Sequence, residues 1–79
     1  MADLTEIVAI RVRQSRNARQ WTQEELADRV GLSVRYIGQV ERCQASPTVS
    51  VLGRLAETLG VEPGELVRRG PRAKTLKPR

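Results

Sequence analysis

Apolar side chains recur every three or four residues along most of this chain, the spacing of helices with one buried face. The first predicted helix begins after Asp3 and extends to about residue 19, because Asp3 with Glu6 three residues later is an N-terminal capping pattern. We expect its inward stripe to contain Leu4, Val8, Val12 and Ser15, with Ile7 and Ile10 beside the stripe and partly exposed.

Two more helices are predicted within residues 22–42, connected by a turn of about four residues. Thr22 and Glu25 form a capping box, and Gly31 supplies the left-handed residue that ends the first of these helices. Ser33 then caps the second helix. The residues expected to be buried are Leu26, Ala27 and Val30 on the first helix, and Ile37 and Val40 on the second.

The periodicity continues into two further predicted helices. One begins at Thr48, with Ser46 before Pro47 as a competing cap, and ends at Gly60. Its expected buried face contains Leu52, Leu55, Ala56 and Leu59. The other is a short helix over about residues 63–68. No segment alternates apolar and polar residues as a strand does, so the sequence predicts a compact all-α fold of five helices.

The composition excludes several classes of protein. A chain of 79 residues forms one small domain. With no histidine and a single cysteine, Cys43, it has neither a His/Cys zinc site nor an internal disulfide, and it lacks the usual general base. We therefore expect no enzymatic activity, no cofactor and no metal. No apolar run could span a membrane and the N-terminus does not resemble a signal peptide, which predicts a cytoplasmic protein without a membrane partner.

The net charge of +5 is unevenly distributed along the chain. Residues 1–67 contain eight arginines and nine acidic residues, whereas residues 68–79 contain six basic residues and no acidic residue. We expect a folded domain over residues 1–69 and a basic tail over residues 70–79. The tail is either a solubilising end or an arm that contacts phosphates. Nucleic-acid binding by the domain must therefore depend on where individual arginines lie.

The helix that follows Ser33 carries a distinctive stripe opposite its buried residues. Helical spacing places on this outer stripe Val34, Arg35, Gly38, Gln39 and Arg42. An arginine can donate two hydrogen bonds to guanine, and a glutamine can pair in a similar way with adenine. A glycine removes bulk where a helix approaches the bases. The stripe is therefore a candidate surface for reading double-stranded DNA in the major groove.

The segment TQEELADRVGLS, followed by YI and QVER, resembles the helix-turn-helix of the phage-repressor and Cro-type (XRE-like) transcriptional regulators. The similarity extends over about residues 8–67 and includes the segment LGV at residues 59–61. It implies a sequence-specific transcriptional regulator that binds double-stranded DNA as a homodimer on a palindromic operator. A dimer is expected because one recognition helix covers few base pairs, whereas two half-sites about 34 Å apart suffice for specificity.

The resemblance also implies roles for individual side chains. The expected base contacts are Val34, Arg35, Gly38 and Gln39, and the expected backbone contacts are Gln23, Ser33, Tyr36 and Arg42. Ser33 can act as a cap alone, and Tyr36 can equally serve the core. The expected dimer interface consists of Pro63, Glu65, Leu66 and Val67. Arg16 and Glu41 match a pair that joins the first helix to the end of the recognition helix; the alternative is two unrelated surface charges.

Three questions remain open at the level of sequence. Glu24, Glu25 and Asp28 form an acidic patch where related activators contact RNA polymerase, although helix capping and the helix dipole explain the same residues. Cys43 stands where the family usually has glycine, so a left-handed backbone there would cost about 1 kcal/mol, and redox sensing by its thiol is a further hypothesis. The alternative function is an antitoxin that neutralises a toxin protein and binds its own operator.

Overall fold

The computed structural model describes residues 3–69; the basic tail predicted over residues 70–79 lies outside the described residues. Its elements are, in order, α1 (Leu4–Ala18), α2 (Gln23–Val30), α3 (Val34–Glu41), α4 (Val49–Leu59) and η1 (Pro63–Val67). The all-α class is confirmed for this part of the chain, which contains no strand. The fifth predicted helix is a five-residue 3-10 helix and not an α-helix, consistent with the use of 3-10 geometry in short segments.

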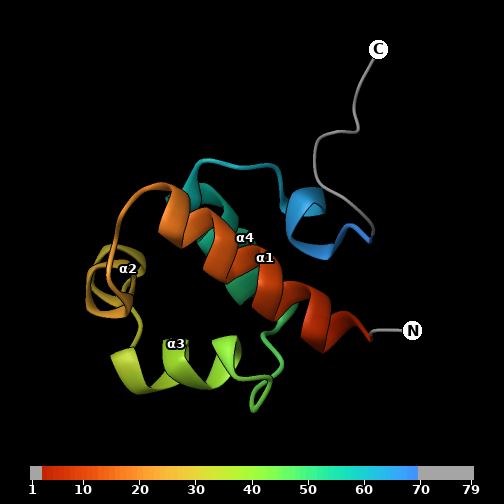
Figure 1. Cartoon of the computed structure of the whole chain (residues 1–79), viewed down its shortest axis with the longest axis horizontal. Coiled ribbons are helices and arrows are strands. Elements are labelled where there is room, and N and C mark those ends of the chain that lie inside the picture. Colours follow the sequence, from red (N-terminus) through yellow and green to blue (C-terminus); the bar gives the residue numbers. More distant parts are fainter. Residues whose placement is uncertain (1–2, 70–79) are drawn as a thin grey trace.

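Helix α1 is the central element of the fold. It contacts α3, α4 and η1, and Figure 1 shows α3 and η1 on different sides of it. Because these partners cover more than one side, the buried arc of α1 is wider than the predicted stripe and includes Ile7 and Arg11. The predictions for two residues were wrong: Ile7 is only 7% exposed, whereas Leu4, in the first turn, is 50% exposed. Ile10 is partly exposed, as predicted.

The core is aliphatic and receives side chains from every element. Its buried members are Val8, Val12, Leu26, Ala27, Val30, Ile37, Val40, Leu55, Ala56, Leu59 and Leu66. This set confirms the predicted inward residues of α2 and α3, and it includes those of α4 except Leu52, which is only partly buried. The inward face of α3 is therefore anchored, and its opposite face is left for contacts outside the domain.

Side-chain caps determine where the four α-helices begin. Asp3, Thr22, Ser33 and Thr48 each accept a hydrogen bond from the backbone N–H three residues later. The capping box of Thr22 and Glu25 is complete, since the Glu25 carboxylate accepts from the Thr22 N–H at 2.8 Å. Thr48 caps α4, which decides between the two predicted starts of that helix. Local sequence alone predicted these starts correctly, because a cap needs only residues within one turn.

A residue with positive φ follows each α-helix. Gly31 (φ 78°) and Gly60 (φ 72°) end α2 and α4 as predicted. After α1 and α3 the same conformation is adopted by Gln20 (φ 59°) and Cys43 (φ 64°), which carry a Cβ atom. At the end of α3, the N–H groups of Cys43 and Gln44 donate to the carbonyls of Val40 and Gln39, forming a Schellman motif.

We expect Cys43→Gly to raise the free energy of unfolding by about 1 kcal/mol, because glycine adopts this left-handed conformation without a Cβ clash. Urea denaturation of the two proteins measures the difference. Asn17→Gly is the control, since Asn17 lies within α1, where glycine is a poorer helix former than asparagine and should destabilise by about 0.3 kcal/mol. A destabilised Cys43→Gly protein would show that the thiol makes contacts worth more than the relieved strain.

Candidate nucleic-acid interface

Helices α2 and α3 form a tightly connected pair, joined only by residues 31–33. The left-handed Gly31 reverses the chain, and Ser33 begins α3 at once. The side chain of Arg54 on α4 fastens this turn, because its Nη2 donates to the Val30 carbonyl at 2.8 Å and lies 3.4 Å from that of Gly31. Those carbonyls belong to the end of α2, where unpaired acceptors and the helix dipole favour a cation.

The outer face of α3 presents the predicted base-reading side chains to solvent. Val34 is 43% exposed, Arg35 is exposed and Gln39 is partly exposed. On the inner face, Ile37 and Val40 are 0% and 1% exposed. The helix is therefore held by apolar packing on one side while an arginine and a glutamine extend from the other. Such a face offers the donors and acceptors needed to recognise base edges.

Gly38 does not lie open on this face, although the sequence placed it there. It is buried, and the guanidinium of Arg42 covers it. A Cβ atom at Gly38 would lie only 2.9 Å from Nη1 of Arg42. A base contact by Gly38 itself would therefore require Arg42 to move away. In this structure the guanidinium of Arg42 occupies the space next to Gly38.

A buried carboxylate ties the end of α3 to the rest of the domain. Glu41 is 4% exposed and accepts two hydrogen bonds from Arg16, from Nε at 2.7 Å and from Nη2 at 2.9 Å. Arg16 also donates through Nη1 to the carbonyl of Trp21 at 2.8 Å. The two-pronged geometry is the strong form of an arginine–carboxylate pair. It holds the recognition helix against α1.

Gln23, at the start of α2, joins the same cluster. Its Nε2 donates to Oε1 of Glu41 at 3.0 Å, across 18 positions of sequence. Glu41 therefore holds both Arg16 and Gln23, which connects the first turn of α2 to the last turn of α3. The Gln23 amide has a second N–H and stands at a helix N-terminus, which is where a phosphate is favoured.

Ser33 and Tyr36 lie at the first turn of α3. The Ser33 hydroxyl accepts from the Tyr36 backbone N–H at 3.0 Å and remains exposed, so the capping role is observed. Tyr36 is half-buried and packs against the core cluster. The ring therefore has a packing role, and a phosphate contact by either hydroxyl stays a prediction.

Comparison with known proteins identifies the arrangement. Residues 12–66 match the family model HTH_3, described as helix-turn-helix. The chain belongs to this helix-turn-helix family. It is a DNA-binding transcriptional regulator of the phage-repressor and Cro type, as the resemblance of its sequence predicted.

Individual relatives support the assignment. The chain is 42% identical over 67 residues to the control protein C.SmaI of Serratia marcescens, covering 85% of this chain and 80% of that protein. It is 36% identical over 61 residues to the HTH-type transcriptional regulator SutR of Escherichia coli (strain K12), covering 77% of this chain and 34% of SutR. The chain thus spans about a third of that regulator. The crystal structure of the hypothetical transcription factor NHTF from Neisseria superposes with a TM-score of 0.81 at 35% identity, covering 84% of this chain and 76% of that one.

The residues predicted for a dimer interface fall into different environments in this helix-turn-helix domain. Pro63 is exposed, Val67 is half-buried, and the Glu65 carboxylate pairs with Arg68 at 2.9 Å. Leu66 is 0% exposed and belongs to the core of the protomer. α1 and α4, which both contact η1, cover this side chain, so Leu66 has a packing role within the protomer, and the interface expected around η1 stays a prediction.

Three arginine and glutamine contacts were missed by the sequence analysis. The bonds from Gln23 to Glu41 and from Arg54 to Val30 cross long stretches of sequence, so no local pattern signals them. Arg11 is 8% exposed and donates to the Arg68 carbonyl from Nε at 3.1 Å and from Nη2 at 2.9 Å. The contact of Arg11 could have been predicted from its position one turn after Ile7, because a buried cation on an apolar helix face needs a hydrogen-bond acceptor from elsewhere in the fold.

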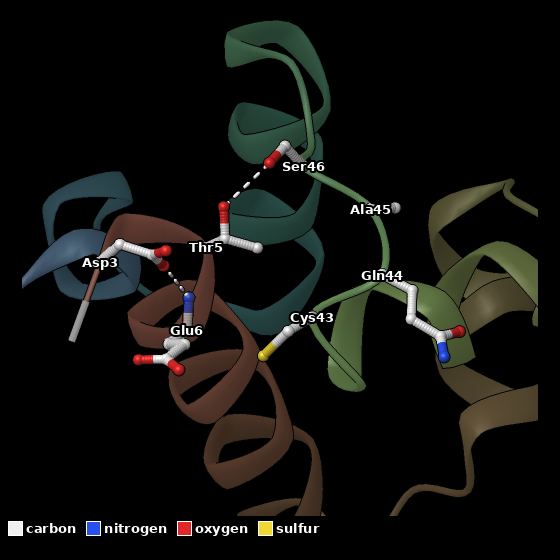
Figure 2. A pocket seen from close by; sticks show the side chains of 7 residues that line it. All are labelled: Asp3, Thr5, Glu6, Cys43, Gln44, Ala45 and Ser46. Carbon is white, nitrogen blue, oxygen red and sulfur yellow. Dashed lines mark hydrogen bonds between the residues drawn. The ribbon is translucent and has the colours of Figure 1, made fainter.

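Other kinds of site find little support in the described part of the chain. Within residues 3–69, no group of three or more histidine, cysteine or acidic side chains is placed to hold a metal ion. None of the helices there is long and apolar enough to cross a membrane. Figure 2 shows an open pocket between the start of α1 and the segment after α3, where the exposed thiol of Cys43 points toward α1. A redox role for this thiol stays a prediction.

Proposed function

We propose that this regulator binds a palindromic operator as a homodimer, with α3 of each protomer in the major groove. The observation that carries the proposal is the outer face of α3, where Arg35 and Gln39 extend from a helix whose inner face is locked in the core. The Arg16–Glu41–Gln23 cluster supports it, because it holds the backbone of α3 in place and so determines where its outward side chains are presented.

The length of α3 argues for two copies. Its eight residues extend about 12 Å, the length of about four base pairs at 3.4 Å each. Four base pairs recur too often in a genome to specify one operator. Two copies related by a twofold axis would read half-sites about 34 Å apart, which makes the operator palindromic.

The surface formed by α1 and η1 is the best-supported place for the second copy. Pro63 on η1 is exposed, and α1, which contacts η1, exposes Leu4 at 50% and Ile10 at 41%. Figure 1 shows η1 on a different side of α1 from α3, so pairing through η1 would leave both recognition helices free. Control by protein concentration then follows, because the dimeric fraction rises as the protein concentration approaches and exceeds the dissociation constant of the dimer. The similarity to a control protein agrees with this regulation.

Phosphate contacts would set the register of the domain on DNA. Gln23 offers its second amide N–H at the start of α2, and Ser33 offers a hydroxyl at the start of α3. Both positions coincide with helix N-termini, where backbone N–H groups and the helix dipole attract anions. Such contacts position the protein without carrying sequence information.

Selecting bound sequences from random duplex DNA tests the proposal, and Arg35→Ala is the informative variant. We expect Arg35→Ala to weaken operator binding by about 1–3 kcal/mol and to relax preference at one base position in each half-site. Gln39→Ala should likewise weaken operator binding and relax the preference at a neighbouring base position. Gln23→Ala is the contrast, since losing a phosphate contact should weaken all duplexes similarly. Unchanged base preference in Arg35→Ala would reject the assignment of Arg35 to base reading.

A further inference from the structure

The side chain of Arg42 lies back along α3 and occupies the space that a side chain at position 38 would fill. An ideal Cβ atom at Gly38 would stand 2.9 Å from Nη1, 3.5 Å from Nη2 and 3.6 Å from Cζ of Arg42. Any larger residue at position 38 would have to displace this guanidinium. The burial of Gly38 on an otherwise exposed face follows from the same contact.

The turn after α3 supplies a hydrogen-bond acceptor for this guanidinium. Nε of Arg42 donates to Oε1 of Gln44 at 3.3 Å. Gln44 is placed by its backbone N–H, which donates to the Gln39 carbonyl at 2.7 Å, and by the left-handed Cys43 before it. Figure 2 shows Cys43 pointing toward α1 and Gln44 pointing away from it. The side-chain amide of Gln44 therefore lies on the side of the turn away from α1, where it accepts the hydrogen bond from Arg42.

The contacts with Gly38 and Gln44, together called the seat of Arg42, leave both terminal nitrogens of the guanidinium available as donors. Among residues 3–69, no acceptor other than Gln44 is found for this guanidinium, so Nη1 and Nη2 remain unused. Helical spacing places Arg42 between Gly38 and Arg35 around the axis, near the centre of the outer stripe. Two parallel N–H groups on a planar fork match the O6 and N7 acceptors of guanine.

We propose that Arg42 reads a guanine in the major groove, oriented by a seat that Gly38 and Gln44 provide. The proposal rests on the proposed function, in which α3 enters that groove, and it assigns to Arg42 a specific role in place of the backbone contact expected from sequence. Gly38 acts on specificity through Arg42, and it touches no base itself. Gly38 and Gln44 are therefore positioning residues.

Arg42→Lys separates base reading from phosphate binding, because lysine keeps the charge and loses the planar fork. In a selection from random duplexes, we expect preference for guanine to fall about 5- to 150-fold at one position in each half-site. Affinity for non-specific DNA and its salt dependence should stay close to those of the unmodified protein, since the charge is retained. If Arg42→Lys keeps every base preference, Arg42 makes a phosphate contact and the proposal is overturned.

Gly38→Ala tests the seat without removing a DNA-contacting group. Alanine favours the helix, so the variant should fold, and circular dichroism checks this. We expect it to lose preference at the same base position as Arg42→Lys, and the double variant should lose no more than either single one. Gly53→Ala on α4 is the matched control, because no atom lies within 4 Å of its added Cβ. Unaltered preference in Gly38→Ala would overturn the positioning role.

The same selection distinguishes failure of this inference from failure of the proposed function. If the unmodified protein selects no sequence, operator recognition by α3 fails and the role of Arg42 fails with it. If it selects a palindrome, and both Arg42→Lys and Gly38→Ala select that same palindrome, operator recognition stands and the role of Arg42 is rejected.

Discussion

Glu41→Ala is expected to lower the free energy of unfolding by about 3–5 kcal/mol, because it removes one partner of a buried ion pair. Its carboxylate is buried, and it is the shared acceptor for Arg16 and Gln23. Removing it leaves the Arg16 guanidinium, whose side chain is 12% exposed, without its counter-charge. Urea denaturation measures the loss directly.

A double-mutant cycle shows how much of this loss belongs to the ion pair. The cost of Glu41→Ala should shrink when Arg16→Ala is already present, because no unpaired cation then remains. Arg13 supplies the matched control, since its Nη1 lies 3.4 Å from the carbonyl of Glu41, an atom that alanine retains. Effects that add in both cycles would show that Arg16 and Glu41 do not interact in solution. Glu41→Gln, with a similar volume, separates the lost charge from the cavity.

Leu66→Ala is expected to destabilise the protomer by about 2–5 kcal/mol, because Leu66 is fully buried in the core cluster. This expectation differs from that for an interface residue. A leucine at a dimer interface would cost stability only where dimers form, so its effect would depend on protein concentration. Urea denaturation at two concentrations tenfold apart therefore distinguishes the two roles.

Val49→Ala is the control for Leu66→Ala. Val49 is 85% exposed on α4, so its removal should change the free energy of unfolding by no more than about 0.5 kcal/mol. A concentration-dependent loss in Leu66→Ala alone would place this side chain at an interface between copies, contrary to its burial in the protomer.

The sequence determined the helices and their order, because the forces that start and stop a helix act within one turn. Thr22, Ser33 and Thr48 each accept from a backbone N–H three residues away, and Gly31 needs only its own backbone freedom. The inward stripes of α2 and α3 were predictable for a related reason, since each of these helices presents one apolar face. The outer stripe of α3 followed as the complement of its buried face.

Tertiary structure decided which of the remaining positions are covered and which charged groups meet. On α1, three packing partners bury Ile7 and leave Leu4 exposed, and a single stripe could not show how wide the covered arc is. Gln23 meets Glu41 because the fold brings the start of α2 to the end of α3, a contact that no local spacing encodes.

The recognition face shows the same division. Sequence alone placed Gly38 on the exposed stripe, since helical spacing gives only the direction in which a residue points from the helix axis. It does not show whether a neighbouring side chain covers that residue. Only the three-dimensional structure shows Arg42 folded over that glycine and held by Gln44. Capping and periodicity are local and can be read from the chain. Burial, ion pairing and the seating of a long side chain depend on what other segments bring to the same place.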